Sequence, residues 1–409
     1  MMKEKSSLMQ NIQNKNFTFI DLFAGAGGFA EGFYQEEYTA LFHVEFDKHA
    51  CDTLKHRMKF YQYPESEINK VRPIDITDKN ILKIIDEGVQ KHDVDVIIGG
   101  PPCQSFSSQG KARDPNGMKC DSRNYLYENY MKVLNHYQPK FFVFENVEGI
   151  LSTVLNGEKL INTIFNDMKK NYKILEDKDD LVLNAVDFGV PQERRRVIII
   201  GIRKDINIID IKSVYDDLKQ IAAMQEKVTV KDAIGDLPKL KAGSGEDRIK
   251  YKPKTTNTYL SKIRNQKDTL LHHHVARRHN DLDKERYKLM SKHRWTLGEL
   301  YEKKPHLVHP RKRLFNNSYA VQHFDKPSKT IIAHLYKDGN QFIHPDHTQS
   351  RTLTPREAAR LQSFPDDFVF PCSRTQQYKQ IGNAVPPLLS KHIAGVLKKY
   401  LKKIKNHDF

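Results

Sequence analysis

The sequence contains few cysteines. Only four occur among its 409 residues, and no two of them form a Cys-x-x-Cys pair. This scatter predicts neither a disulfide framework nor a structural zinc site, and it favours a reducing compartment, the cytoplasm. The four are Cys51, Cys103, Cys120 and Cys372.

Long hydrophobic runs are also missing. No apolar stretch approaches the ~20 residues that span a bilayer, and the mean hydropathy is −0.66. Residues 1–16 are polar and carry lysines, so no secretory signal is predicted. We therefore expect no membrane contact. The length still suits two lobes, or one large domain with an insertion.

Acidic residues are outnumbered by basic ones. The chain has 67 lysines and arginines against 51 aspartates and glutamates, a formal charge of +16. This excess favours a polyanionic partner, because each neutralised phosphate releases condensed counterions. A lysine-rich, solvated surface would give the same balance, so charge alone does not identify nucleic acid as the partner.

Short apolar runs alternate with stretches of helical spacing in the first half of the chain. This alternation predicts βαβ units, a mostly parallel sheet and an α/β fold. Such sheets bind ligands at the carboxyl ends of their strands. Helices are expected at 81–91 and 125–137. The expected strands are Phe17–Phe23, Thr39–Val44, Val94–Ile98, Phe141–Phe144 and Val197–Ile202.

The composition and periodicity of the sequence change after about Arg203. Residues 203–350 are rich in Lys, Asn, His and Tyr and have weak periodicity. Thr354, followed three residues later by Glu357, is typical of a capping box at a helix start. The final stretch, 387–404, predicts an amphipathic helix with a basic face. We therefore expect three segments with bounds at 17–202, 203–355 and 356–409.

A glycine-rich turn follows the first predicted strand. Gly25-x-Gly27-x-x-Ala30 is a relaxed version of a nucleotide-binding fingerprint, in which small residues allow the backbone to approach a ligand. Glu45 lies 20 residues beyond Gly25, where an acid accepts hydrogen bonds from ribose hydroxyls. Asp75 follows a third short run and is placed to accept from an adenine amino group. This pattern fits NAD and S-adenosylmethionine (AdoMet) equally.

Cys103 follows two prolines directly after a predicted buried strand. The prolines fix φ and remove two backbone donors, so the loop leaves the sheet stiffly. This suits a nucleophile that points into a cleft, although a lone cysteine is usually a small buried hydrophobe. A thiol also needs local positive charge or an adjacent base to ionise.

Charged residues adjoin two other predicted strands. Glu145 ends the run Phe141–Phe144, and it is either a structural acid or one that protonates a substrate ring nitrogen. Three arginines, Arg194 to Arg196, precede the strand Val197–Ile202. They form either a solvated turn or a site that binds anions and carbonyl groups.

Eight segments, taken in order, resemble motifs of the cytosine-C5 DNA methyltransferase family of bacterial restriction-modification systems. The resemblance covers nearly the whole chain except its middle. The segments are Asp21–Gly28, Glu45-Phe46, Asp75-Ile76, Pro101-Pro102-Cys103-Gln104, Glu145-Asn146-Val147, Gln192-x-Arg194-x-Arg196, Arg356–Gln362 and Gly382–Pro386.

The resemblance implies an enzyme with a Rossmann-like AdoMet-dependent methyltransferase fold and a smaller, irregular target-recognition domain at 203–355. Residues 17–202 would form the catalytic AdoMet-binding domain, which 356–409 complete with a hinge helix and C-terminal segment. Implied cofactor contacts are Phe23, Gly25, Gly27, Glu45, Phe46, Asp75, Ile76, Pro102, Leu126, Asn383 and Ala384.

The family's chemistry assigns the catalytic roles. The Cys103 thiolate would add to C6 of a flipped-out cytosine while Glu145 supports protonation at N3, and C5 would then take the methyl group of AdoMet. Arg196 would contact the base O2, and Arg194 a phosphate or the active-site loop. Loss of the C5 proton and elimination of Cys103 would complete the reaction.

Double-stranded DNA is the implied partner. The segment Ser105–Arg123 resembles the mobile loop that closes over DNA, and Thr330 lies in a short Thr-plus-aliphatic signature of the recognition region. His272, His273 and His274 lack supporting metal-ligand spacing, so groove or phosphate contact is the preferred interpretation and no metal is expected. Predicted DNA contacts are Gln104, Ser107, Gln109, Lys111, Arg123 and Thr330.

Two alternatives remain. A methyltransferase acting on tRNA cytosine shares these motifs, but it usually carries a Cys-Phe-Thr signature that the sequence lacks. A catalytically inactive DNA-binding homologue would not need Cys103, Glu145 and Arg196 intact. We expect a monomer, with a cognate restriction endonuclease as a possible partner.

Overall fold

The computed structural model describes residues 17–102, 126–155, 157–251, 257–265, 269–309 and 318–407. The chain divides into two compact units. The sheet unit comprises Met1–Phe188, Arg195–Gln225 and Pro387–Phe409, and the loop unit comprises Gly189–Arg194 and Glu226–Pro386. These bounds differ from the expected segments, because 203–225 belong to the sheet unit and 356–386 to the loop unit.

A seven-stranded sheet forms the centre of the sheet unit, in the order β2-β1-β3-β4-β9-β7, with β8 also paired to β9. All five predicted runs form strands. The neighbours from β2 to β4 are parallel, whereas β9 runs antiparallel to β4, β7 and β8. The strands are β1 (Thr18–Leu22), β2 (Thr39–Val44), β3 (Val96–Gly99), β4 (Phe141–Val147), β7 (Tyr172–Lys173), β8 (Val182–Asn184) and β9 (Arg195–Arg203).

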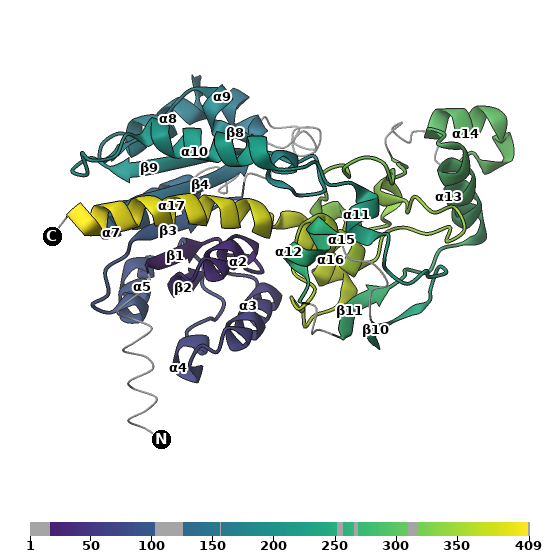
Figure 1. Cartoon of the computed structure of the whole chain (residues 1–409), viewed down its shortest axis with the longest axis horizontal. Helices are drawn as coiled ribbons and strands as arrows, with labels where there is room; N and C mark the ends of the chain where they lie inside the picture. Colours follow the sequence, from purple (N-terminus) through teal and green to yellow (C-terminus); the bar gives the residue numbers. More distant parts are fainter. Residues whose placement is uncertain are drawn as a thin grey trace. The chain divides into compact units, whose positions relative to one another are not determined.

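Helices surround this sheet (Figure 1). The two helices expected in the first half are present as α5 and α7. The α-helices of the unit are α2 (Gly28–Gln35), α3 (Lys48–Phe60), α4 (Glu65–Ile68), α5 (Ile81–Val89), α7 (Leu126–Tyr137), α8 (Leu160–Met168), α9 (Lys178–Leu181), α10 (Ile211–Met224) and α17 (Pro387–His407). Its shorter elements are β5 (Val154–Leu155), β6 (Glu158–Lys159), η2 (Glu148–Ser152) and η3 (Ala185–Phe188).

The last helix, α17, completes the sheet unit by packing on α2 and α10 (Figure 1). Its contact with α2 is close, because a Cβ on Gly32 would lie 2.2 Å from the Lys391 backbone nitrogen. The Ser390 hydroxyl donates to the Phe29 carbonyl. The C-terminal helix therefore packs on α2, the first helix among the described residues.

The loop unit has little regular structure. Its strands β10 (Gly245–Lys250) and β11 (Leu270–Val275) form an antiparallel hairpin. Its α-helices are α11 (Val230–Ile234), α12 (Thr258–Ile263), α13 (Asp281–His293), α14 (Leu297–Lys303), α15 (Pro355–Leu361) and α16 (Arg374–Asn383). Short 3-10 helices lie at η4 (Pro305–Leu307), η5 (Ala333–Tyr336) and η6 (Asn340–Phe342).

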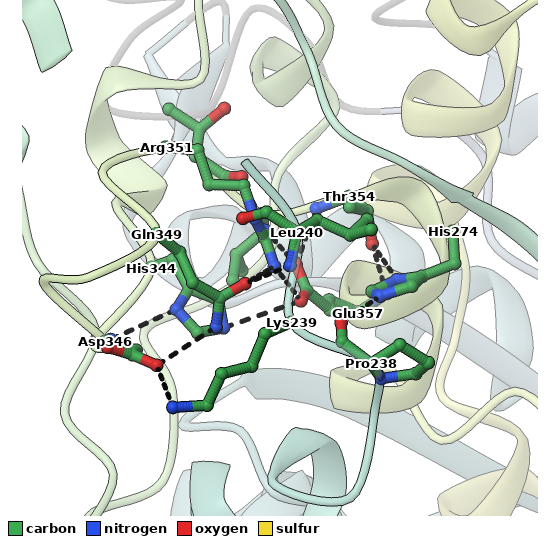
Figure 2. A network of polar contacts seen from close by, with 12 residues as sticks. Pro238, Lys239, Leu240, His274, His344, Asp346, Gln349, Arg351, Thr354 and Glu357 are labelled. Atoms are coloured by element: carbon green, nitrogen blue, oxygen red, sulfur yellow. Dashed lines mark hydrogen bonds and ion pairs between the residues drawn. The ribbon is translucent and has the colours of Figure 1, made fainter. Parts of the chain in front are cut away.

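Buried ion pairs hold the loop unit together. Figure 2 shows the network around Glu357, whose carboxylate forms two hydrogen bonds of 2.7 Å with the fully buried Arg351 guanidinium. The same carboxylate accepts from the Thr354 backbone nitrogen, which completes the predicted capping box of α15. His344 lies 3.5 Å from Glu357. The helix start is thus fixed by charges inside the unit.

Candidate active site

The glycine-rich turn begins where β1 ends. Phe23, Gly25 and Gly27 all have positive φ, at 58°, 55° and 87°. A Cβ on Gly27 would lie 2.7 Å from the Leu54 side chain, so this position needs glycine for space as well as for conformation. A Cβ on Gly25 would meet no described heavy atom within 4 Å. The turn therefore presents a bare backbone to open space at the carboxyl end of a strand.

Glu45 follows β2 and binds this turn. One carboxylate oxygen accepts from the Gly25 backbone nitrogen at 2.7 Å, and the other accepts from the backbone nitrogens of Phe46 and Asp47. Burial raises the pKa of Glu45, and these backbone donors offset part of the rise. Because each carboxylate oxygen can accept more than one hydrogen bond, Glu45 can fix the turn and still accept from a ribose hydroxyl.

The second acid lies beside the first. The Ile74 backbone nitrogen donates to the Glu45 carbonyl at 2.7 Å, which brings the following residue, Asp75, to the same edge of the sheet. Asp75 is exposed, and the Phe46 ring is 74% exposed. The short run before Asp75 forms no strand, and Pro73 makes an isolated parallel bridge with Glu45.

The remaining predicted cofactor contacts differ from Glu45 and Asp75 in their exposure or in the unit to which they belong. Ile76 is buried at 4% exposure, so its side chain supports the loop from within and is not presented to a ligand. Pro102 is exposed and Leu126 half-buried, both in the sheet unit. Asn383 and Ala384 lie in the loop unit at the end of α16. Their contact with a cofactor stays a prediction.

Glu145 lies at the base of the loop that leads to Cys103. A Cβ on Gly100 would be 2.6 Å from a Glu145 carboxylate oxygen, so a side chain at this position would displace the carboxylate. The neighbouring Asn146 side chain donates to the Pro101 carbonyl at 3.2 Å. Strand β4 therefore holds the start of the Pro-Pro-Cys segment directly beside its own carboxylate. Cys103 itself lies outside the described residues, as do the predicted DNA contacts Gln104, Ser107, Gln109, Lys111 and Arg123.

Arg196 and Glu145 form an ion pair across β4 and β9. The Arg196 Nε lies 3.0 Å from a Glu145 oxygen, and each side chain is 14% exposed. Burial lowers the pKa of Arg196, and the adjacent Glu145 carboxylate offsets this effect. The ion pair is thus largely removed from water, but both side chains keep some surface that a ligand can contact. Arg195 instead forms an exposed pair with Glu148.

Arg194 binds backbone within the loop unit. It is buried at 2% exposure, and its guanidinium donates to the carbonyls of Ile331, Gly382 and Ala384. These three bonds join two segments of the loop unit, a structural role that the sequence did not predict. Its contact with a phosphate or the active-site loop stays a prediction.

Sequence reasoning assigned no role to Gln192, the first residue of the same motif. Its side-chain amide donates to the Leu361 carbonyl at 3.1 Å and to the Gln362 side chain, and its oxygen accepts from the Ile331 nitrogen at 2.7 Å. The motif spacing was the available signal, because Gln192 and Arg194 both bind Ile331. Together they tie the motif to the 331 segment and to α15.

The histidine run and Thr330 also lie in the loop unit. His273 and His274 are buried and hydrogen-bonded, to the Phe370 nitrogen and the Pro238 carbonyl respectively, so the predicted groove or phosphate contact is wrong for both. His272 is half-exposed. The Thr330 hydroxyl donates to the Glu193 carbonyl at 2.5 Å, and its predicted DNA contact stays a prediction. Among the described residues, no group of three or more His, Cys, Asp or Glu could hold a metal ion.

A family model for C-5 cytosine-specific DNA methylase matches residues 17–399. The chain belongs to this family. A Type II methyltransferase of Bacillus paralicheniformis, M.Bpa9945I, is 33% identical over 93% of this chain and 98% of its own length. M.DdeI of Desulfomicrobium norvegicum, another Type II methyltransferase, is 34% identical over 94% of this chain and 89% of its own.

Solved structures agree with the methylase fold. An E. coli structure described as a prophage-encoded DNA modification methyltransferase is 26% identical and has a TM-score of 0.69. It covers 95% of this chain and 100% of its own. No helix among the described residues of this methylase is long and apolar enough to cross a membrane. The chain is therefore a C5 cytosine DNA methyltransferase with an α/β fold and a mostly parallel sheet.

Proposed function

We propose that this methylase transfers a methyl group from AdoMet to C5 of a cytosine in a specific sequence of double-stranded DNA, through a covalent Cys103–C6 intermediate. The observation that carries the proposal is the packing of Glu145, paired with Arg196, against Gly100. Gly100 precedes Cys103 by three residues in the sequence. The packing therefore supports an acid and a cation close to the proposed nucleophile.

The residues of the sheet unit fit AdoMet. Gly25 leaves open space where a side chain would be, Glu45 and Asp75 supply acceptors for hydroxyl and amino groups, and the exposed Phe46 ring offers a stacking surface. When bound, AdoMet supplies the methyl group as an electrophile. The Pro101-Pro102-Cys103 segment has no evident use in a nicotinamide oxidoreductase, which disfavours NAD.

Each residue then has one task. Cys103 Sγ forms a bond to C6, and Glu145 delivers a proton to N3, so that the electron pair displaced from the ring collects at C5. Arg196, held by Glu145, binds the base O2. C5 takes the methyl group, which would leave the cofactor as a neutral thioether. A base then removes the C5 proton, N3 returns its proton to Glu145, and the C6–S bond breaks to return the thiolate. The cytosine must first leave the duplex, at a cost of a few kcal/mol.

We further propose that the loop unit selects the DNA sequence and that a cognate restriction endonuclease accompanies the enzyme. The Type II relatives support this proposal. Sequencing bisulfite-treated DNA from cells that express the chain should show protected cytosines in one recurring sequence. Protection at cytosines of unrelated context would contradict sequence-specific recognition.

Labelled AdoMet distinguishes the two nucleic acids. Purified enzyme incubated with duplex DNA or with tRNA should place the label on cytosine C5 of the duplex. Label on tRNA alone would overturn the proposal. No transfer to either, with duplex binding retained, would instead favour the inactive homologue.

A further inference from the structure

Helices α13 and α14 of the loop unit form a hairpin with its own apolar core (Figure 1). Tyr287 and Met290 on α13 and Leu297 and Leu300 on α14 are buried in this core together with Leu307. Arg294, between the helices, has a φ of 55° and ends α13. The positions of side chains on the outside of the hairpin are therefore fixed by a packed interior.

The only tryptophan of the chain lies at the end of this hairpin. The Trp295 ring stacks on the His293 ring, with centroids 4.4 Å apart and an interplanar angle of 19°. The Lys303 ammonium lies 5.7 Å from the centroid of the same ring. We call His293, Trp295 and Lys303 the Trp295 cluster. A cation over an aromatic face is attracted by the ring quadrupole, which positions the ammonium without neutralising its charge.

The lysines around the cluster are exposed or half-exposed, and among their local counter-charges is the exposed Glu299, whose pKa is lowered by hydrogen bonds from Thr296 and by the nearby Lys303. Lys292, Lys303 and Lys304 form no ion pair with another described residue. Glu299, the acid in the first turn of α14, accepts from the Thr296 nitrogen and hydroxyl in a capping box. Arg294 pairs with Asp325. The three lysines are thus available to an anionic partner.

We propose that the Trp295 cluster and its flanking Lys292 and Lys304 bind backbone phosphates of duplex DNA. The inference rests on the proposed function, in which duplex DNA is the substrate. Phosphate contacts position a protein on DNA without reading its sequence. Lysine is a compact point charge with three rotatable donors, which suits single phosphate oxygens. A protein partner would be favoured by exposed apolar side chains, whereas Trp295 is half-buried and its neighbours are charged.

Trp295 makes the proposal measurable, because tryptophan fluorescence of the full chain comes from this cluster alone. A 40-base-pair duplex of arbitrary sequence is added to the enzyme, and quenching by acrylamide is followed. DNA should protect Trp295 from the quencher. Binding is measured in parallel by gel shift, so that the two readings can be compared.

Charge-removing variants test the lysines. Replacing Lys292, Lys303 and Lys304 by glutamine should weaken duplex binding about tenfold at moderate salt. The slope of log K against log salt should become less steep by about 0.9 for each phosphate that the variant no longer neutralises. Lys403→Gln is the matched control, because Lys403 is an exposed lysine on α17 of the sheet unit. An equal effect of the control would show that net charge alone matters, and would overturn the proposal.

Other outcomes separate this inference from the proposed function. If DNA binds and is methylated while Trp295 and the lysine variants give no response, the surface is wrong and the function stands. If tRNA alone binds and is methylated, the proposed function fails first. Protection that rises with enzyme concentration in the absence of DNA would identify a second copy as the partner and would also overturn the assignment.

Discussion

The two units are stabilised in different ways. In the sheet unit, Phe141, Phe142, Val143 and Phe144 of β4 are completely buried apolar residues. In the loop unit, α15 buries Arg356, Glu357 and Arg360 just as completely. When the core of a sheet is apolar, polar residues can gather near the ends of its strands. Glu145 lies near the carboxyl end of β4. A unit built from loops must satisfy many carbonyl groups that no ladder pairs.

Arginine performs this task in the loop unit. Arg356 donates to the carbonyls of His272, Pro365 and Phe368, and Arg194 donates to three others. A guanidinium has five donors in a rigid fork, so one side chain can join several loops. Buried charges hold the loop unit together, and the sheet unit also has such a pair in Arg57–Glu31, besides the partly exposed Glu145–Arg196 pair that we propose for catalysis. Removing a charge from the Glu145–Arg196 pair should therefore affect methyl transfer most, and removing one from α15 should affect stability most.

Glu145→Gln should give the largest effect. Methyl transfer should fall roughly 10²- to 10⁴-fold, because the carboxyl group that protonates N3 is lost. The unfolding free energy should fall less than for Glu357→Gln, because the Arg196 side chain that loses its partner keeps 14% of its surface exposed, whereas Arg351 is fully buried. Single-turnover rates with labelled AdoMet measure the loss. Glu148→Gln, which removes an exposed partner of Arg195, is the matched control and should keep nearly full activity.

Glu357→Gln should destabilise the loop unit by about 3–5 kcal/mol, because it leaves the buried Arg351 guanidinium uncompensated. Denaturant unfolding followed by Trp295 fluorescence reports on this unit. A conservative core change in the sheet unit, Ile200→Val, should cost only about 0.5–1.5 kcal/mol. Equal losses for the two substitutions would remove the distinction between the units.

Acidification should weaken the loop unit. Burial lowers the pKa of His344 to about 4, from 6.5 for the exposed side chain. The unfolded chain therefore binds a proton below pH 6.5, whereas the folded chain does not until about pH 4. Stability is full above pH 6.5 and falls by about 3 kcal/mol as the pH drops to 4, since one pKa unit corresponds to about 1.4 kcal/mol.

Denaturant titrations at several pH values, read from Trp295, measure this dependence. His344→Gln should reduce it, and part of the remaining dependence should come from His279 of the same unit, because burial lowers the pKa of that side chain to about 4 as well. The buried carboxyl of Glu357, whose pKa is lowered by Arg351 and His344 despite its burial, acts in the same direction at lower pH. A stability that rises between pH 6.5 and 4 would contradict the account.

The smallest effect should come from Arg195 in the arginine motif. Arg195→Gln breaks only an exposed ion pair and should change the unfolding free energy by less than about 1 kcal/mol. Arg194→Gln, one position away, leaves buried carbonyls of the loop unit without their donors, each at a cost of roughly 1–3 kcal/mol. The pair of variants is compared by denaturant unfolding. Similar values would mean that Arg194 does not join the loops.

The sequence was informative wherever periodicity and motif agreed. Five of the seven sheet strands, the capping box of α15 and the positions of Glu45 and Glu145 follow from apolar runs and from the residues that follow them. The direction of β9 did not follow, because an apolar run looks the same in either orientation. The role of Arg194 was also missed, since its partners are carbonyls far away in the sequence.

The loop unit was hardest to predict for the same reason. Its interior contains charged side chains beside apolar ones, so burial leaves only a weak hydrophobic pattern in the sequence. His273 and His274 illustrate this, because their polarity suggested an exposed surface while their hydrogen bonds place them inside. Resemblance to a family supplied what composition could not, namely the order of the motifs.

Cys103 is the centre of the account, and one experiment tests it most directly. Wild-type enzyme and Cys103→Ala are compared for transfer of labelled methyl groups to duplex DNA and for DNA affinity. The account predicts that the variant binds duplex DNA about as well as the wild type while transfer is abolished. Equal transfer by the two proteins would contradict the nucleophile assignment and, with it, the covalent mechanism.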